Sequence, residues 1–290
     1  MMRAAGAGSA LRGIAVLALA TVAAGAVAAG EASRVLRVCA DPSNLPYSND
    51  RGEGFENRIA NLVAKDLNAS VEYTWNMQRR GFLRRTLNAN ACDLVIGLPS
   101  GLQGVAHTRP YYASTYVFVT RRERGLALRG FDDPRLRKLK IGLQAVGADG
   151  ANPPPASALG QRGIVDNIVG FSVWGVESDE TPQRHIIDAV ASGQIDVAIV
   201  WGPFAGFFAQ SLGDELVINP VAGDPLQPEL EFRYAFSMGV RRGDGALLEE
   251  VQQSLDRRQR DIESILIEYG IPLVPLTAEG SLAAVAAGRT

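Results

Sequence analysis

Few residues in this sequence could bind a metal ion or act as a nucleophile. The chain of 290 residues contains two His and two Cys, whereas a structural zinc site or an iron–sulfur cluster usually takes four such ligands. His107 and His185 stand at no recognisable spacing from Cys39 or Cys92, so the pattern of a thiolate activated by an imidazole is missing. The sequence therefore predicts no metal site and no catalytic thiol.

Carboxyl groups could instead serve acid–base catalysis, and Glu56 and Asp149 are the candidates. No nucleophile elbow, metal triad or phosphate loop accompanies either residue in the sequence. Gly147 and Gly150 precede a proline-rich stretch rather than a helix, which argues against a phosphate cradle. We therefore expect a protein that is not an enzyme and carries no cofactor.

The elements that must position these residues alternate as in an α/β fold. Short apolar runs alternate with amphipathic ones, which predicts βαβ units and a parallel sheet. Strands are expected over residues 35–40, 71–75, 93–98, 116–120, 139–143, 171–174, 196–201 and 232–240. Helices are expected over 55–67, 80–87, 183–192, 247–255 and 262–269, and a loop over 145–155.

Two stretches of the chain resemble each other weakly. Each runs from a helix end through a turn to an aspartate, Asp93 or Asp196, that opens an apolar strand and is followed by Gly and Pro. Two similar lobes would explain this echo, but any junction between a helix and a parallel strand can look alike, and both explanations stay open.

The sequence also does not decide whether the two cysteines form a disulfide. Two thiols in an oxidising compartment usually bond. However, Cys39 falls late in one expected strand and Cys92 just before a neighbouring one. A disulfide needs Cα atoms about 6 Å apart, and these positions in the two strands make that distance doubtful. The sequence therefore leaves both a disulfide and two free thiols possible.

Aromatic and polar side chains lie at or just beyond the ends of expected strands, which face the crevice in open α/β sheets. Rings there could grip a ring-shaped ligand or an inserted segment of another protein, although about half would be ordinary core, Phe207 or Phe208 among them. Asp41, which precedes Pro42, could equally be a turn former. The candidates are Asp41, Asn44, Tyr47, Phe55, Tyr111, Tyr112, Gln144, Trp201 and Phe204.

Four arginines form a basic group over residues 79–85. Arg79 and Arg80 could dock an acidic partner, or they could simply face water. For Arg84 and Arg85 the solvated face of a helix is the favoured interpretation.

The composition indicates the class of protein, and the first residues indicate its cellular location. A chain that is 47% hydrophobic and 21% charged is typical of a globular protein, and its formal charge of -2 provides no basic field for nucleic acid. Arg3 and Arg12, the uncharged run over residues 14–29 and Ala26-Val27-Ala28 predict a signal peptide over residues 1–28. We therefore expect a periplasmic protein without a membrane span, ending in a flexible tail over 277–290.

Several segments in order resemble type 2 periplasmic solute-binding proteins. The resemblance implies two lobes, each a mostly parallel sheet flanked by helices, joined by two crossover segments around a ligand cleft. Lobe 1 would take residues 34–120 and 233–276, and lobe 2 residues 121–232. The segments are Leu36-Arg-Val-Cys-Ala-Asp41, Leu45-Pro-Tyr47, Gly54-Phe-Glu56, Pro110-Tyr-Tyr112 and Phe236-Ser-Met-Gly-Val-Arg-Arg-Gly-Asp244.

A narrower resemblance is to the quinoprotein-dehydrogenase-associated branch, the MoxJ/XoxJ-type accessory proteins of the PQQ methanol dehydrogenase system. It implies a PQQ-dependent methanol dehydrogenase as partner, of calcium or lanthanide type, and leaves open whether its cytochrome c also binds. The matching segments are Gln78-Arg-Arg-Gly-Phe82, Thr108-Arg-Pro-Tyr-Tyr112, Asn152-Pro-Pro-Pro-Ala156, Arg162-Gly163 and Val200-Trp-Gly-Pro-Phe-Ala-Gly206.

The sequence departs from amino-acid receptors of this fold at two positions. Those receptors carry an Arg shortly before the Pro-Tyr-Tyr element, but residues 98–108 contain none and Arg109 directly precedes Pro110. They also place an Asp where Val200 and Trp201 stand here. Two hypotheses follow: an accessory protein that binds a PQQ-dependent dehydrogenase through an aromatic interlobe cleft, or a transport receptor for a small aromatic or apolar solute.

Overall fold

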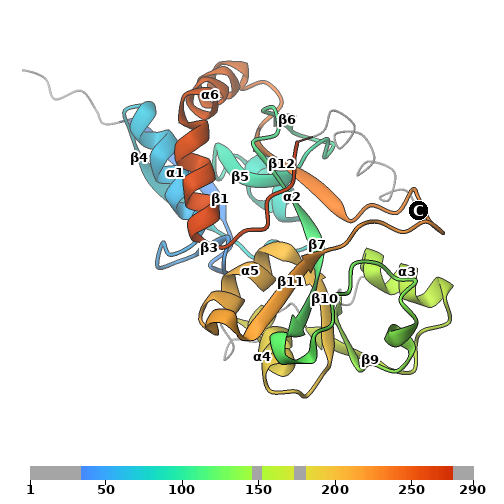
Figure 1. Cartoon of the computed structure of the whole chain (residues 1–290). Helices are drawn as coiled ribbons and strands as arrows, with labels where there is room; N and C mark the ends of the chain where they lie inside the picture. Colours follow the sequence, from blue (N-terminus) through green and yellow to red (C-terminus); the bar gives the residue numbers. More distant parts are fainter. Residues whose placement is uncertain (1–33, 146–151, 173–180, 277–290) are drawn as a thin grey trace, which may run out of the picture. The chain divides into compact units, whose positions relative to one another are not determined.

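The computed structural model of the chain describes residues 34–145, 152–172 and 181–276 (Figure 1). The predicted signal peptide over 1–28 and the predicted tail over 277–290 lie outside these ranges. Gly147, Asp149, Gly150 and the end of the strand predicted over 171–174 also lie outside them.

Within those ranges, ten strands pair in one mixed sheet, in the order β4-β1-β5-β12-β7-β10-β8-β9, with β11 added to β7 and β6 to β12. The α/β class is as predicted. Parallel pairing joins β4, β1 and β5 at one end and β10, β8 and β9 at the other. Between them β7 and β12 run antiparallel to their neighbours, so the sheet is less parallel than helix–strand alternation suggested.

β7 connects the two parts of the sheet. Its residues 112–115 pair with β12, and its residues 116–121 pair with β10 and β11. We call β4, β1, β5, β12 and β6 the first sheet section, and β10, β8, β9 and β11 the second. The strands of the sheet are β1 (Arg34–Ala40), β4 (Ala69–Trp75), β5 (Leu94–Pro99), β6 (Ala106–His107), β7 (Tyr112–Arg121), β8 (Ile141–Ala145), β9 (Ile168–Ser172), β10 (Val197–Trp201), β11 (Leu216–Pro220) and β12 (Arg233–Val240). A separate short hairpin pairs β2 (Ser43–Asn44) with β3 (Ser48–Asn49).

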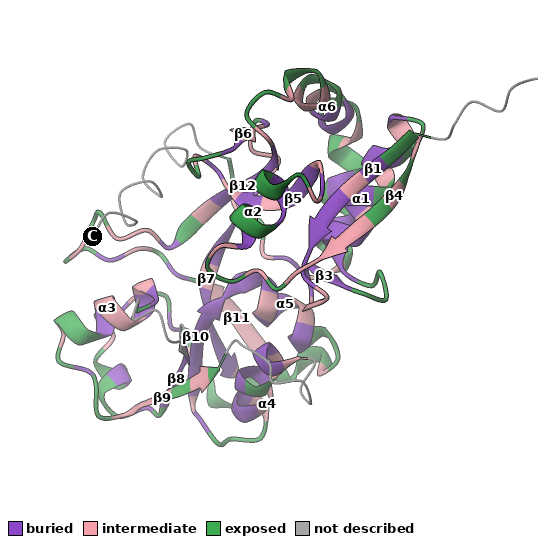
Figure 2. Ribbon diagram, turned by 180° about the vertical axis from the view of Figure 1, so that it is seen from behind, coloured by how far each residue is buried: buried purple, intermediate pink, exposed green. Residues whose placement is uncertain are grey.

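The helices cover the sheet with their apolar faces. In α1, which confirms the helix expected over 55–67, Phe55, Ile59 and Val63 are fully buried and lie four residues apart on one face. Figure 2 shows buried residues along β7 and β10 and exposed ones on the outer side of α2. The α-helices are α1 (Phe55–Asp66), α2 (Phe82–Arg85), α3 (Pro154–Gln161), α4 (His185–Ala191), α5 (Gly202–Gln210) and α6 (Gly245–Glu268). The 3₁₀ turns are η1 (Leu87–Ala89), η2 (Arg122–Arg124), η3 (Pro134–Arg137), η4 (Pro182–Arg184) and η5 (Gly213–Glu215).

Three predictions of secondary structure were wrong. The helices expected over 247–255 and 262–269 are one helix, α6, because the charged residues between them are exposed helix formers rather than a break. The loop expected over 145–155 ends in α3, which starts with prolines tolerated in a first helical turn. The helix expected over 80–87 is divided into α2 and η1, and β11 was not predicted.

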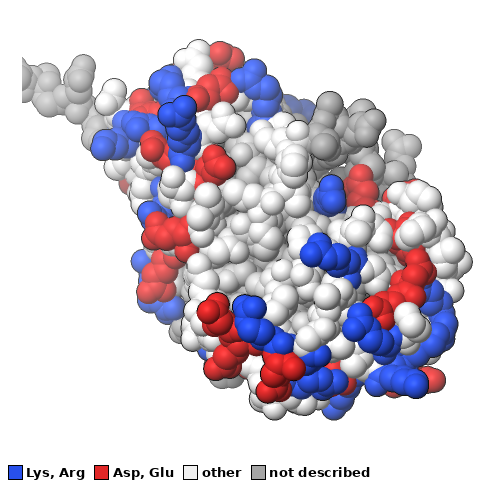
Figure 3. Space-filling model, viewed as in Figure 1, with Lys and Arg blue, Asp and Glu red and all other residues white. Residues whose placement is uncertain are grey.

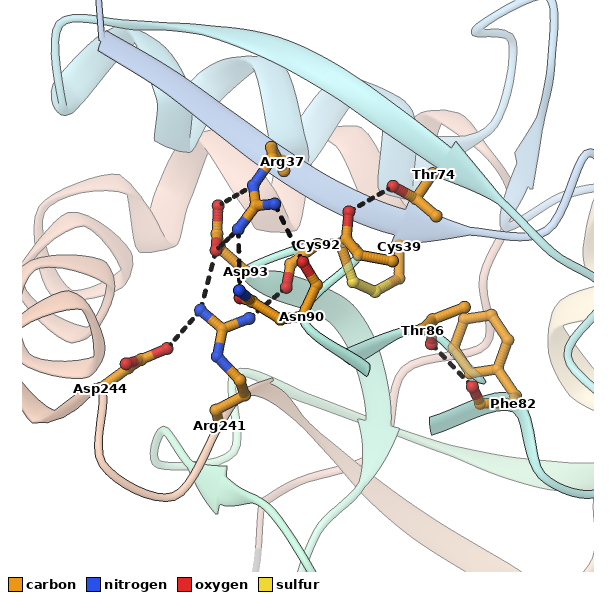
Figure 4. The surroundings of a disulfide bond; sticks show 11 residues. Arg37, Cys39, Thr74, Phe82, Thr86, Asn90, Cys92, Asp93, Arg241 and Asp244 are labelled. Carbon is orange, nitrogen blue, oxygen red and sulfur yellow. Dashed lines mark hydrogen bonds and ion pairs between the residues drawn. A yellow bond between two sulfur atoms is a disulfide. The ribbon is translucent and has the colours of Figure 1, made fainter. Parts of the chain in front are cut away.

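The two aspartates of the sequence echo have the same structural role. Asp93 accepts hydrogen bonds from Arg37 (2.6 and 2.9 Å) and Arg241 (2.8 Å) just before β5 (Figure 4). Asp196 accepts them from Arg124 (2.6 Å) and the Lys140 backbone N–H (2.8 Å) just before β10. Each carboxylate therefore fixes the start of a central strand through an arginine.

Cys39 and Cys92 form a disulfide, with their Cα atoms 5.5 Å apart (Figure 4). β1 and β5 are neighbouring parallel strands, as predicted, with Cys39 opposite Val95. This strand register is compatible with the disulfide. Cys92 lies before β5, so its Cα position is not fixed by the pairing of β5 with β1. Both cysteines are buried.

Candidate functional site

Trp201 lies at the centre of the predicted site, at the last position of β10. Its indole Nε1–H donates a hydrogen bond to the Tyr47 hydroxyl oxygen at 2.5 Å. Its backbone N–H donates to Gln144 Oε1 at 3.0 Å, and Gln144 lies near the end of β8. Because β8 and β10 are parallel neighbours, their carboxyl ends bring these two side chains together.

The predicted aromatic residues contact one another around Trp201. The Tyr47 ring centroid lies 5.0 Å from that of Phe55 and 5.7 Å from that of Phe204. Phe55 is 6.0 Å from Tyr112, which in turn lies 5.0 Å from Tyr111. The structure thus brings together all six aromatic candidates. We call these residues and the neighbours that sequence reasoning missed the aromatic cluster: Tyr47, Phe55, Tyr111, Tyr112, Tyr116, Trp201, Phe204, Tyr234 and Phe236.

The missed members carry a signal that could have found them. Tyr234 and Phe236 are two residues apart on β12, so they point to the same side of the sheet. Both rings lie within 6 Å of the Trp201 ring, at 5.7 and 5.9 Å. An alternating aromatic pair on a strand expected to cross the sheet was therefore a usable indication.

Burial separates the members of the aromatic cluster. Phe55 is 0% exposed and Tyr112 3%, so both belong to the core. Trp201 and Tyr47 are 9% and 8% exposed, and Tyr111 and Phe204 are partly buried. By exposure, Tyr111 and Phe204 can therefore meet a ligand with least rearrangement, and Trp201 and Tyr47 follow.

The polar candidates differ in whether their side chains already have hydrogen-bond partners. Asp41 accepts backbone N–H donors from Ser43 (2.9 Å) and Gln78 (2.7 Å), so its carboxylate holds the turn that follows β1. Asn44 donates to the side-chain oxygen of Gln78 at 3.2 Å. Gln144 differs, because its buried Nε2 finds no hydrogen-bond partner among the described residues. A buried amide donor without a partner is costly, and an acceptor on a ligand would satisfy it.

Glu56 places an ionisable group under this cluster. It follows Phe55 in the first turn of α1 and is 4% exposed, with its carboxyl group packed against Gly97 of β5. Burial, together with the Asp41 carboxylate, raises the pKa of Glu56 to about 8. Burial also raises the pKa of Tyr47, Tyr111 and Tyr112. At neutral pH the cluster therefore presents neutral rings and hydroxyls.

We expect Glu56 to make the protein less stable as the pH rises from about 4.5 to 8. Over that interval the folded chain keeps the Glu56 proton, whereas the unfolded chain, with a pKa of about 4.3, has released it. Its contribution to the free energy of unfolding should fall by about 1.4 kcal/mol per pH unit in this window. Urea titrations at several pH values should show that Glu56→Gln removes this decline and that Glu263→Gln, at an exposed site on α6, retains it.

Arg109 does not replace the arginine whose guanidinium binds the ligand carboxylate in amino-acid receptors of this fold. Its guanidinium contacts both oxygens of Asp256 on α6 at 2.7 Å, and its side chain is exposed. The band around α5 on the face drawn in Figure 3 is largely free of Lys, Arg, Asp and Glu, which gather over α6 and along the opposite margin. Among the described residues, this face around α5 is suited to an apolar or aromatic group and offers few charges that could pair with a zwitterion.

Arg79 and Arg80, the candidate docking residues, are exposed and lie just before α2. Within the described ranges no group of three or more His, Cys, Asp and Glu could hold a metal ion. In the same part of the chain, no helix combines the length and the apolar composition needed to cross a bilayer.

Comparisons with known proteins agree with this geometry. The crystal structure of the periplasmic binding protein XoxJ from Methylobacterium extorquens AM1 is 35% identical and has a TM-score of 0.68, covering 83% of this chain and 100% of that one. The structure of MxaJ from Methlophaga aminisulfidivorans MPT is 25% identical with a TM-score of 0.70, covering 82% and 100%. Protein MoxJ of Methylorubrum extorquens AM1 is 29% identical over 250 residues, which is 83% of this chain and 82% of that protein.

The family model of the bacterial extracellular solute-binding proteins, family 3, matches residues 36–269. This range includes the whole aromatic cluster and all of the sheet except the first two residues of β1. The chain belongs to the family 3 bacterial extracellular solute-binding proteins.

Proposed function

We propose that this chain is a periplasmic, non-enzymatic accessory protein that binds a PQQ-dependent methanol or alcohol dehydrogenase and assists its assembly or activation. The likeness to XoxJ, MxaJ and MoxJ supports this assignment, because resemblance to that branch implies such a dehydrogenase as the partner. The observation that carries the proposal is the aromatic cluster, in which Trp201 stands at the end of β10, where amino-acid receptors of this fold place an Asp.

On this proposal, lobe 1 comprises residues 34–120 and 233–276, and lobe 2 comprises residues 121–232. Tyr47 and Trp201 then belong to different lobes, and their hydrogen bond closes the cleft. One such bond contributes about 0.5–1.5 kcal/mol, and the Tyr47–Phe204 ring contact adds an amount of similar size. Opening at this point is therefore cheap, and an inserted aromatic or aliphatic side chain of the dehydrogenase would offset its cost by contacting the same rings.

The expected result is that Trp201→Ala weakens binding of the apo dehydrogenase at least about tenfold, since buried aromatic anchors contribute about 2 kcal/mol or more. Calorimetry with the purified partner measures the dissociation constant. Trp75→Ala is the matched control, because Trp75 is a partly buried tryptophan of β4 that stacks on Tyr73 and has no ring contact with the aromatic cluster among the described residues. Its binding should be unchanged.

Trp201→Phe keeps a ring and loses the N–H donor, and should show an intermediate loss even if Trp201→Ala folds poorly. Absence of binding by the wild-type chain would refute the proposal. A rise in melting temperature with a small aromatic solute, without dehydrogenase binding, would instead identify a transport receptor.

A further inference from the structure

A hollow of about 340 Å³ lies between α2 and the C-terminal end of β5, apart from the aromatic cluster. Phe82 and Leu98, both buried, line it together with Leu102, which is 38% exposed. Arg79 and Arg84 line it as well, and both are exposed. α2 lies on the face turned to the viewer in Figure 2, with its outer side exposed.

The apolar lining of this hollow rests on the disulfide. Phe82 and Leu98 belong to the same buried cluster as Cys39 and Cys92, and Phe82 lies beside the disulfide in Figure 4. Thr86 also ties the segment together, because its hydroxyl donates to the Phe82 carbonyl oxygen at 2.7 Å. The lining is therefore held in place before anything binds, which lowers the entropic cost of binding.

The charge around the hollow has one sign. None of the residues that line it is acidic. Arg85 adds a further cation to the segment, since its guanidinium donates to the Arg80 carbonyl oxygen (2.9 Å) and to Asn76 Oδ1 (3.1 Å). Carboxylates form strong, often bidentate hydrogen bonds with guanidinium groups.

We propose that this hollow docks an acidic segment of a partner protein whose carboxylates flank an aliphatic or aromatic side chain. Carboxylates would meet Arg79 and Arg84, and the apolar side chain would lie on Phe82, Leu98 and Leu102. Met77, one residue before the lining residue Gln78, adds an apolar side chain that is 43% exposed to the same segment. An occupant long enough to reach both the hollow and Met77 is a protein segment rather than a free small molecule. The inference stands on these residues and does not depend on the proposed function.

The probe is a fluorescein-labelled hexapeptide of alternating Glu and Leu, titrated with the mature chain by fluorescence anisotropy. Arg84→Gln and Leu102→Ser should each raise the dissociation constant at least threefold, and neither change disturbs a buried side chain. Arg260→Gln, the same loss of charge at an exposed site on α6, should change it less than 1.5-fold. Replacing Leu by Ser in the peptide should also weaken binding at least threefold.

Amide chemical shifts on addition of the peptide at up to millimolar concentration should move over residues 77–84 and 97–102. Equal losses for Arg84→Gln and Arg260→Gln would show that only overall charge attracts the peptide, and would overturn the proposal. Shifts confined to other parts of the chain, or no shift at all, would overturn it too.

Discussion

Replacing Cys39 and Cys92 together by alanine should lower the free energy of unfolding by about 4 kcal/mol. The bond joins residues 53 positions apart, and in the chain-entropy account a loop of that size restricts the unfolded chain by about 4 kcal/mol. Alanine is the appropriate replacement because both side chains are buried and a serine hydroxyl would need a partner there. Urea denaturation of the purified chain measures the loss.

The wild-type chain unfolded in dithiothreitol provides the matched comparison, and its stability should approach that of the double variant. The variant itself should not respond to the reductant. A loss below about 1 kcal/mol would mean that the disulfide does not restrict the unfolded chain as its loop length requires. Phe82 and Leu98 pack with the two cysteines. The double variant should therefore also bind the acidic peptide in the hollow more weakly.

Arg162→Met should lower the free energy of unfolding by about 3–5 kcal/mol, the usual cost of removing one partner of a buried ion pair. The Arg162 and Asp224 side chains are 6% and 0% exposed, and two hydrogen bonds of 2.6 and 2.8 Å join them. Arg162 also contacts Asp132 at 2.7 Å and the face of Phe131 at 5.9 Å. Methionine fills the space but leaves the Asp224 carboxylate buried without its cation.

The double variant Arg162→Met, Asp224→Asn should recover much of this loss, because it removes the orphaned charge as well. Arg135→Met is the matched control: Arg135 also contacts both oxygens of an aspartate, Asp133, but its guanidinium side chain is 47% exposed and that of Asp133 is 21% exposed, so this pair should contribute at most about 1 kcal/mol. Arg162 holds the pKa of Asp224 below its usual range. The pair's contribution is therefore present above pH 4 or so and lost on acidification, and equal losses for Arg162→Met and Arg135→Met would contradict this account.

The sequence predicted local elements better than it predicted which of them meet. The face of α1 and the strands around Cys39 and Cys92 follow from periodicity, which acts over a few residues. Arg162 stood in a segment that resembled a subfamily, but its partner Asp224 is 62 residues away and no local pattern marks it. The same holds for antiparallel β7 and β12, whose direction is set by the path of the chain rather than by their composition.

The candidate site shows the same limit. The positions of Gln144 and Trp201 at strand ends predicted that they lie close together, because β8 and β10 are parallel neighbours and share an edge. Tyr47 instead reaches Trp201 from the turn between β2 and β3. The spacing of residues along the chain could not show which rings pack on one another, or that Phe55 belongs to the core. It also could not show that the Asp41 side chain holds a turn. Those roles depend on contacts between residues far apart in the chain.

The carboxyl group of Glu56 also restricts a position that looks unremarkable in the sequence. A Cβ atom at residue 97 would lie 1.9 Å from Glu56 Oε1. The glycine is thus required by its neighbour across the helix–sheet interface and not by its own backbone angles. A side chain at 97 requires the buried Glu56 carboxyl group to move or residue 56 to become smaller. The two sites should therefore covary among relatives, with the acid and the glycine gained or lost together.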